Sequence, residues 1–104
     1  MAQFDIHRNL NPDTKKLFPY LLNLQSDLLE VIATRVVVPL AREEAIGKPA
    51  QKLNPRFSVE GATLIMNTGE IAGVPKRILG EVAGSASHRR GEVIAALDVL
   101  FTGI

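Results

Sequence analysis

The chain has 104 residues, of which 46% are hydrophobic and 22% are charged, so its composition is that of a folded globular domain and not of a disordered chain. Twelve Lys and Arg residues face eleven Asp and Glu residues, and the resulting net charge of +1 excludes a general attraction to nucleic acid or to an anionic membrane. The absence of cysteine excludes disulfides and thiolate chemistry, and the length predicts a single domain over residues 1–104.

The first part of the chain shows the patterns of short strands. Residues 3–7 alternate between apolar and polar side chains, which predicts a half-buried strand with His7 at its surface. An Asn-Leu-Asn-Pro-Asp segment then predicts a turn, after which residues 18–24 predict a second strand that pairs back on the first. Residues 34–40 are rich in β-branched side chains and predict a third strand, which we expect to end at Pro39 because proline cannot donate a ladder hydrogen bond.

Two further strands and a break follow. Residues 56–59 and 62–67 flank a Glu60-Gly61 pair and predict a hairpin, since glycine accepts a positive φ at little cost. The Gly-Val-Pro segment at 73–75 predicts a break in structure. Residues 76–82 then predict a short returning strand.

The period changes from Ser85 onward and predicts a C-terminal helix. Ser85 or Ser87 is the expected cap, and a turn-like start near residues 87–91 is expected because Gly91 costs about 1 kcal/mol relative to alanine. Gly103 stands where helices commonly end. One face of the helix carries the apolar residues Val93, Ile94, Leu97, Leu100 and Phe101. Short strands followed by one helix predict a mainly β fold, a small antiparallel barrel or sandwich.

No motif for catalysis or metal binding occurs. His7 and His88 lie at opposite ends of the chain, with His88 expected at the helix start, and no pair has metal-ligand spacing. Glu43 and Glu44 are adjacent and predict a solvated turn, not an acid–base pair. There is no nucleophile elbow and no glycine-rich phosphate loop. The sequence therefore predicts no enzyme, no cofactor and no metal.

Targeting signals are also missing from the sequence. The N-terminal segment lacks the layout of a signal peptide. The longest apolar runs, such as residues 36–41, are far shorter than the roughly 20 residues that cross a bilayer. We expect a soluble, cytoplasmic protein with no membrane partner.

Two surface features remain as candidates for recognition. The doublets at 76–77 and 89–90 are basic, but few aromatic residues accompany them to stack bases, so we favour a solvated basic face over a phosphate site. Phe101 and Ile104 are large apolar residues at a chain end that would otherwise fray. They either pack on the chain's own barrel or bind a partner, and the residues alone leave both interpretations open.

Six short stretches of the sequence resemble those of a known protein family. They are QF at 3–4, QSDLL at 25–29, RVVVPLA at 35–41, VP with ILGE at 74–75 and 78–81, SHR at 87–89, and FTGI at 101–104. In order, spacing and chain length they resemble the CcdB family, the gyrase-poisoning toxins of bacterial toxin–antitoxin modules. The resemblance covers nearly the whole chain.

The resemblance implies a fold, a function and a set of partners. The fold would be an SH3-like antiparallel barrel with a C-terminal α-helix. The protein would be a homodimer that binds the A subunit of DNA gyrase, traps the enzyme on cleaved DNA, and is neutralised by a cognate antitoxin. It would make or break no bond itself. Because the net charge is near zero, we expect it to bind operator DNA only together with the antitoxin.

The resemblance also implies site residues. Leu100 is expected at the dimer interface, near the two-fold axis. The gyrase-binding surface would comprise Leu28, Leu29, Asp98, Phe101, Thr102, Gly103 and Ile104. The best-known family member has Trp where this chain has Thr102, so one stacking contact is expected to be missing. The alternatives are a ribonuclease toxin on the same barrel, or an inactive regulatory module that only binds the antitoxin and, together with it, DNA.

Overall fold

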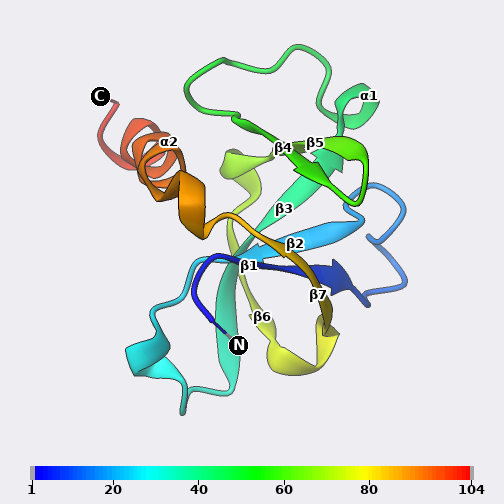
Figure 1. The fold of residues 1–104 in the computed structure, drawn as a ribbon, viewed down its shortest axis with the longest axis vertical. Helices are drawn as coiled ribbons and strands as arrows, with labels where there is room; N and C mark the ends of the chain where they lie inside the picture. The colour runs from blue at the N-terminus through cyan, green and yellow to red at the C-terminus, as the bar shows by residue number, and fades with distance from the viewer. Residues whose placement is uncertain (1, 104) are drawn as a thin grey trace.

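One antiparallel sheet forms the body of the molecule in the computed structural model, which describes residues 2–103 (Figure 1). Within these residues the sheet has seven strands in the order β4-β5-β3-β2-β1-β7, and β6 pairs separately with β3. The strand bounds are β1 (Asp5–Asn9), β2 (Tyr20–Asn23), β3 (Thr34–Arg42), β4 (Arg56–Val59), β5 (Ala62–Met66), β6 (Ala72–Pro75) and β7 (Leu79–Ser85).

The helical segments are short except near the C-terminus. The α-helices of the described residues are α1 (Glu43–Ile46) and α2 (Arg90–Thr102), and the 3-10 turns are η1 (Asp27–Leu29), η2 (Thr68–Glu70), η3 (Lys76–Ile78) and η4 (Ser87–Arg89). Figure 1 shows α2 at the side of the curled sheet, with the C-terminus at its far end. The prediction of a mainly β antiparallel barrel with a C-terminal helix is confirmed, and the sheet takes the form of a curled half-barrel.

Strand β3 is the centre of the sheet and continues past the proline at which we expected it to stop. The backbone of Pro39 faces the side of η2, where its carbonyl accepts a hydrogen bond from the Asn67 amide at 2.9 Å. On this side β6 pairs with the first half of β3 and β5 with its end, so Pro39 lies in the gap between two ladders. The missing amide hydrogen therefore removes no ladder bond there, and the strand runs on to Arg42.

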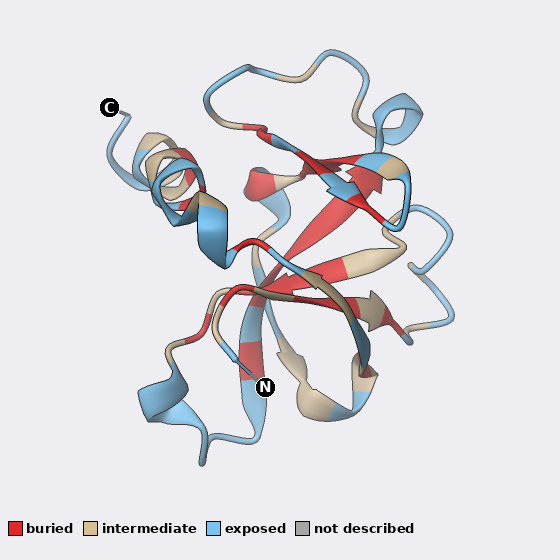
Figure 2. Cartoon of the chain, viewed as in Figure 1, coloured by how far each residue is buried: buried red, intermediate tan, exposed pale blue. Residues whose placement is uncertain are grey.

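Buried residues are concentrated in the central strands of the sheet (Figure 2), and its two faces bury different kinds of side chain. One face forms the main apolar core, to which three central strands contribute fully buried side chains, among them Leu22, Val38, Leu40 and Leu64. The opposite face carries a smaller apolar cluster of Leu21, Val37 and Leu79. Alternation along the strands places several buried polar residues on this second face, namely His7, Asn9, Asn23 and Arg35.

This second face explains why the prediction of His7 at the surface is wrong. His7 lies opposite Leu21 on β2 and Val82 on β7, and only 3% of it is exposed. Its Nδ1 lies 2.9 Å from the carbonyl oxygen of Gly80. The alternating pattern of β1 predicts that one face of the strand is exposed to solvent. Here, residues that follow β6 fold over that face and cover it.

The segment at 73–75 is a strand and not the predicted break. Residues of β6 pair with β3 from Thr34 to Val37, and Pro75 is the last residue of the strand, opposite Thr34. Proline is tolerated at the end of a strand, and Gly73 has open space around it. The predicted strand over 76–82 begins only at Leu79, because η3 turns the chain first.

The β4–β5 hairpin has the predicted turn, and a polar cluster holds it on the sheet. Glu60 and Gly61 have φ values of 50° and 83°, the conformation that a tight two-residue hairpin requires. The Glu60 carboxylate accepts hydrogen bonds from the Tyr20 hydroxyl at 2.6 Å and from Arg8 Nη2 at 2.5 Å. The bond from Tyr20, and then that from Arg8, lowers the pKa of Glu60. The hairpin tip is thus tied to β1 and β2.

We predict that Glu60→Gln makes the thermal midpoint less sensitive to acid. Because the folded-state pKa of Glu60 is lowered, its ionised carboxylate stabilises the fold above its ordinary value of 4.5, and this stability is lost as the pH falls through the lower folded-state pKa. Melting curves between about pH 7 and pH 3 would measure this. Glu81→Gln is the matched control, since Glu81 is 3.8 Å from Arg8 and mostly exposed. An equal acid dependence in both variants would contradict the prediction.

Candidate functional site

The start of α2 is anchored on the sheet by arginines rather than by a serine cap. The predicted turn-like start is confirmed, because η4 precedes the helix. The prediction of Ser85 or Ser87 as its cap is wrong, because the N-cap position of α2 is Arg89, which makes no side-chain capping hydrogen bond. Ser85 Oγ instead accepts a hydrogen bond from the Ser87 amide at 3.1 Å. The Arg89 guanidinium lies 4.3 Å from the centre of the Phe57 ring. It also forms an ion pair with Glu92 at 2.5 Å, and these contacts hold the helix start.

The apolar face of α2 is divided between the core and the outside. Val93 and Ala96 are completely buried against the sheet. Ile94 is 36% exposed and Phe101 is 68% exposed. Residues three and four apart share one helical face, so the apolar stripe predicted from the sequence is wider than the part that the sheet covers.

The end of α2 forms an exposed tip. Phe101, Thr102 and Gly103 are all exposed, and Asp98 lies one turn earlier on the exposed surface. The Thr102 hydroxyl donates to the Asp98 carbonyl at 2.7 Å. Gly103 ends the helix as predicted, with φ of 77°, and its amide donates to the carbonyl of Val99 at 3.0 Å. Ile104 lies outside the described residues.

This geometry favours one of the two interpretations of the tail that the sequence left open. With most of its ring in solvent, Phe101 does not pack on the chain's own barrel. A Cβ placed on Gly103 would meet no atom within 4 Å. The described part of the tail is therefore an accessible surface and not a piece of the core.

The second group of candidate residues lies around η1. Leu28 is 92% exposed and Leu29 is 46% exposed, and their immediate neighbours Val31 and Ile32 are 94% and 42% exposed. Figure 1 shows η1 and α2 on the same side of the view, with the N-terminal segment between them. The described candidate residues thus come from two separate segments of the chain, η1 and the end of α2.

The residues considered for catalysis do not converge. His88 is exposed on η4 and His7 is buried in β1. Glu43 is exposed and forms an ion pair with Arg56 at 2.7 Å. Residues 2–103 contain no group of three or more His, Asp and Glu side chains that could hold a metal ion.

The basic doublets are far apart and engaged in different contacts. Figure 1 places η3, with Lys76 and Arg77, at the opposite end of the view from α2, which follows Arg89. The Lys76 ammonium donates to the carbonyl of Glu30 at 2.8 Å. The two doublets therefore do not form one phosphate-binding surface.

No helix within the described part of the chain is long and apolar enough to span a membrane.

Comparison with known families identifies the chain. A family model described as CcdB protein matches residues 3–103. The chain belongs to the CcdB family. It is a toxin of a CcdA–CcdB module that poisons DNA gyrase without catalysis of its own, and its partners are the A subunit of gyrase and the CcdA antitoxin. The resemblance seen in the sequence is confirmed, and the family sets aside the ribonuclease alternative.

Sequence reasoning missed two features near η1. Val31 and Ile32 extend the exposed apolar surface beyond Leu28 and Leu29, and Arg35 is buried behind them at 1% exposure. The signal was present in the sequence, because four apolar residues at 28, 29, 31 and 32 precede the strand and an arginine interrupts the β-branched residues after them.

We predict effects of different size on stability for two substitutions on α2. Val93→Ala should lower the free energy of unfolding by about 1 to 3 kcal/mol, because it leaves a cavity under the helix. Phe101→Ser should change it by no more than about 0.5 kcal/mol, because its ring is mostly in solvent. Urea unfolding at neutral pH would measure both. A loss for Phe101→Ser as large as that for Val93→Ala would show that Phe101 belongs to the core.

Proposed function

We propose that this CcdB family toxin binds the A subunit of gyrase through the exposed end of α2 and the η1 patch. The proposed gyrase-binding residues are Leu28, Leu29, Asp98, Phe101, Thr102, Gly103 and Ile104. The observation that carries the proposal is the 68% exposure of Phe101 on a helix whose start is anchored in the core. An aromatic side chain held at a rigid helix end is a suitable anchor for a protein interface. Gyrase acts on DNA, so we place the toxin in the cytoplasm.

Gly103 has two roles in this proposal. Its positive φ ends the helix, and its lack of a side chain permits close approach of the partner. Thr102 differs from the Trp of the best-known member and makes a hydrogen bond within α2 instead of presenting a ring. A missing cation–π contact of that kind weakens binding by about 0.5 to 2 kcal/mol.

We predict that deleting residues 102–104 abolishes the trapping of gyrase on cleaved DNA while the protein stays folded. The deletion removes the hydrogen bonds from the Thr102 hydroxyl to the Asp98 carbonyl and from the Gly103 amide to the Val99 carbonyl. It removes no described buried side chain. A cleavage assay with supercoiled DNA measures trapping, and circular dichroism measures folding. If the folded, shortened protein still trapped gyrase, the tail would not be the effector.

Gly103→Asn separates the two roles of Gly103 in the same assay. Asparagine tolerates the left-handed conformation, so the helix end should be kept, whereas its side chain would obstruct a closely approaching partner. We expect an unchanged melting temperature and less gyrase trapped on cleaved DNA. Thr102→Trp is the companion variant and should preserve or strengthen trapping, because it supplies an aromatic ring at the proposed interface.

We also propose a homodimer with Leu100 near its two-fold axis. Leu100 is half-buried at the end of α2, and the apolar stripe of this helix is wider than the sheet covers. A self-complementary apolar patch is the usual basis of a two-fold dimer. We predict a dimer in sedimentation at micromolar concentration and dissociation by Leu100→Lys, with Val82→Lys as the control, because Val82 is an exposed apolar residue on β7 and not on α2. A monomeric parent protein would contradict this.

Operator DNA is expected to bind only the toxin–antitoxin complex. The net charge is +1, which gives no strong field to attract DNA. Ion pairs with glutamates already engage several basic side chains, namely Arg8, Arg35, Arg56 and Arg89. We therefore propose that the antitoxin supplies most of the contacts to DNA phosphates.

A further inference from the structure

The loop of residues 27–33 has an unusual relation to the core. Every residue in it is exposed, including the apolar Leu28, Leu29, Val31 and Ile32. A loop without buried side chains has no packing to fix its shape, and such loops usually open easily. Its shape must therefore be fixed by polar contacts.

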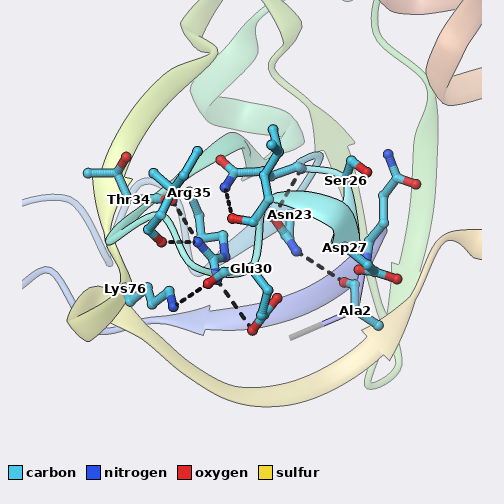
Figure 3. Close-up of polar contacts among 12 residues, drawn as sticks. Ala2, Asn23, Ser26, Asp27, Glu30, Thr34, Arg35 and Lys76 are labelled. Carbon is cyan, nitrogen blue, oxygen red and sulfur yellow. Dashed lines mark hydrogen bonds and ion pairs between the residues drawn. The ribbon is translucent and has the colours of Figure 1, made fainter.

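Arg35 makes several of these contacts with a single side chain (Figure 3). Its Nη1 donates to the carbonyl oxygens of Ile32 at 2.5 Å and Thr34 at 2.8 Å. Its Nη2 donates to the carbonyl oxygen of Glu30 at 2.8 Å and lies 3.3 Å from the Glu30 carboxylate. The planar fork of one guanidinium thus fixes three backbone carbonyls at once.

Lys76 and Gln25 also hold carbonyls of the same loop. The Lys76 ammonium donates to the Glu30 carbonyl at 2.8 Å, from η3 on the neighbouring segment (Figure 3). Gln25 Nε2 donates to the Leu29 carbonyl at 3.2 Å, while Gln25 Oε1 accepts from the Val36 amide at 3.0 Å. These contacts use the loop backbone and leave its apolar side chains in solvent.

Stability alone does not explain why an arginine is buried at position 35. Burying a charge is costly, and an apolar side chain of similar volume is often as stable at such a position. Only 1% of Arg35 is exposed, whereas half of its acidic partner Glu30 is exposed, so the charge is only partly compensated. A rigid loop, by contrast, binds a partner more tightly because less freedom is lost on association.

We propose that Arg35 is a positioning residue for gyrase poisoning, which fixes the loop of residues 27–33 so that Leu28 and Leu29 meet gyrase in a preformed arrangement. This inference rests on the proposed gyrase-binding function of those two leucines. Arg35 itself is buried and does not touch the partner. Lys76 acts on the same carbonyl from outside and contributes less.

The test compares variants by their affinity for the purified A subunit of gyrase, at a temperature at which each is folded. Arg35→Lys keeps the charge but loses the fork, and we expect about tenfold weaker binding. Lys76→Met should weaken binding by about threefold. Arg77→Met is its matched control, because it removes the same charge from an adjacent exposed residue, and it should bind within about twofold of the parent.

Two further measurements separate positioning from general stability. Leu64→Ala destabilises the main core on β5 and should leave gyrase affinity within about twofold of the parent in the folded protein. Amide hydrogen exchange should accelerate at Leu29 and Ile32 in Arg35→Lys but not in Leu64→Ala. Normal gyrase affinity in folded Arg35→Lys and in Lys76→Met would overturn the proposal. If Arg35→Lys does not fold, Lys76→Met against Arg77→Met decides it.

Leu28→Ser distinguishes this inference from the function on which it rests. Leu28 is 92% exposed, so its replacement should leave folding unchanged. If Leu28→Ser weakens binding while Arg35→Lys and Lys76→Met do not, the gyrase surface stands and the positioning role is wrong. If Leu28→Ser has no effect on affinity, the loop is not part of the gyrase surface and both are wrong.

Discussion

The pairing of β3 with three other strands is the constraint on which the rest of the structure depends. Its even-numbered residues Val38 and Leu40 fill the main core, while Val37 and Arg35 face the second side of the sheet. Because both faces of β3 are covered between Val37 and Ala41, the small sheet buries enough apolar surface with only Val93 and Ala96 contributed in full by α2. The rest of the helix is therefore free to carry surface residues.

The same strand connects the core to the proposed gyrase surface. Arg35 is its second residue and fixes the loop that precedes it, while the strand beyond is locked by pairing with β2 and β5. The exposed end of α2 is anchored through Arg89 and Val93. A toxin that only binds needs rigid, exposed anchors rather than a cavity with reactive groups, and both patches have this character.

Much of the fold was predictable from local patterns, because strand alternation, the Glu60-Gly61 turn and helical periodicity are properties of short segments. The errors arose where distant segments decide the outcome. His7 is buried because the chain after β6 covers the second face, and β3 passes Pro39 because two other strands leave a gap there. Neither effect has a signal in the residues next to it.

The site was less predictable than the fold. Its residues came from resemblance to a family, since periodicity alone gave Phe101 equal reason to lie in the core or outside it. The three-dimensional burial of Val93 and Ala96 is what turns Phe101 outward. The burial of Arg35 was not predicted, because a charged residue within a strand is normally expected at the surface, and its proposed role follows from its contacts with backbone carbonyls.

The central claim is that this chain acts on gyrase by binding and performs no reaction itself. The most direct measurement incubates the purified protein with gyrase, ATP and supercoiled DNA, and then detects linear DNA after detergent and protease treatment. We expect linear DNA to accumulate with increasing protein only when gyrase is present. Linear DNA formed without gyrase, or none formed with gyrase at saturating folded protein, would contradict it.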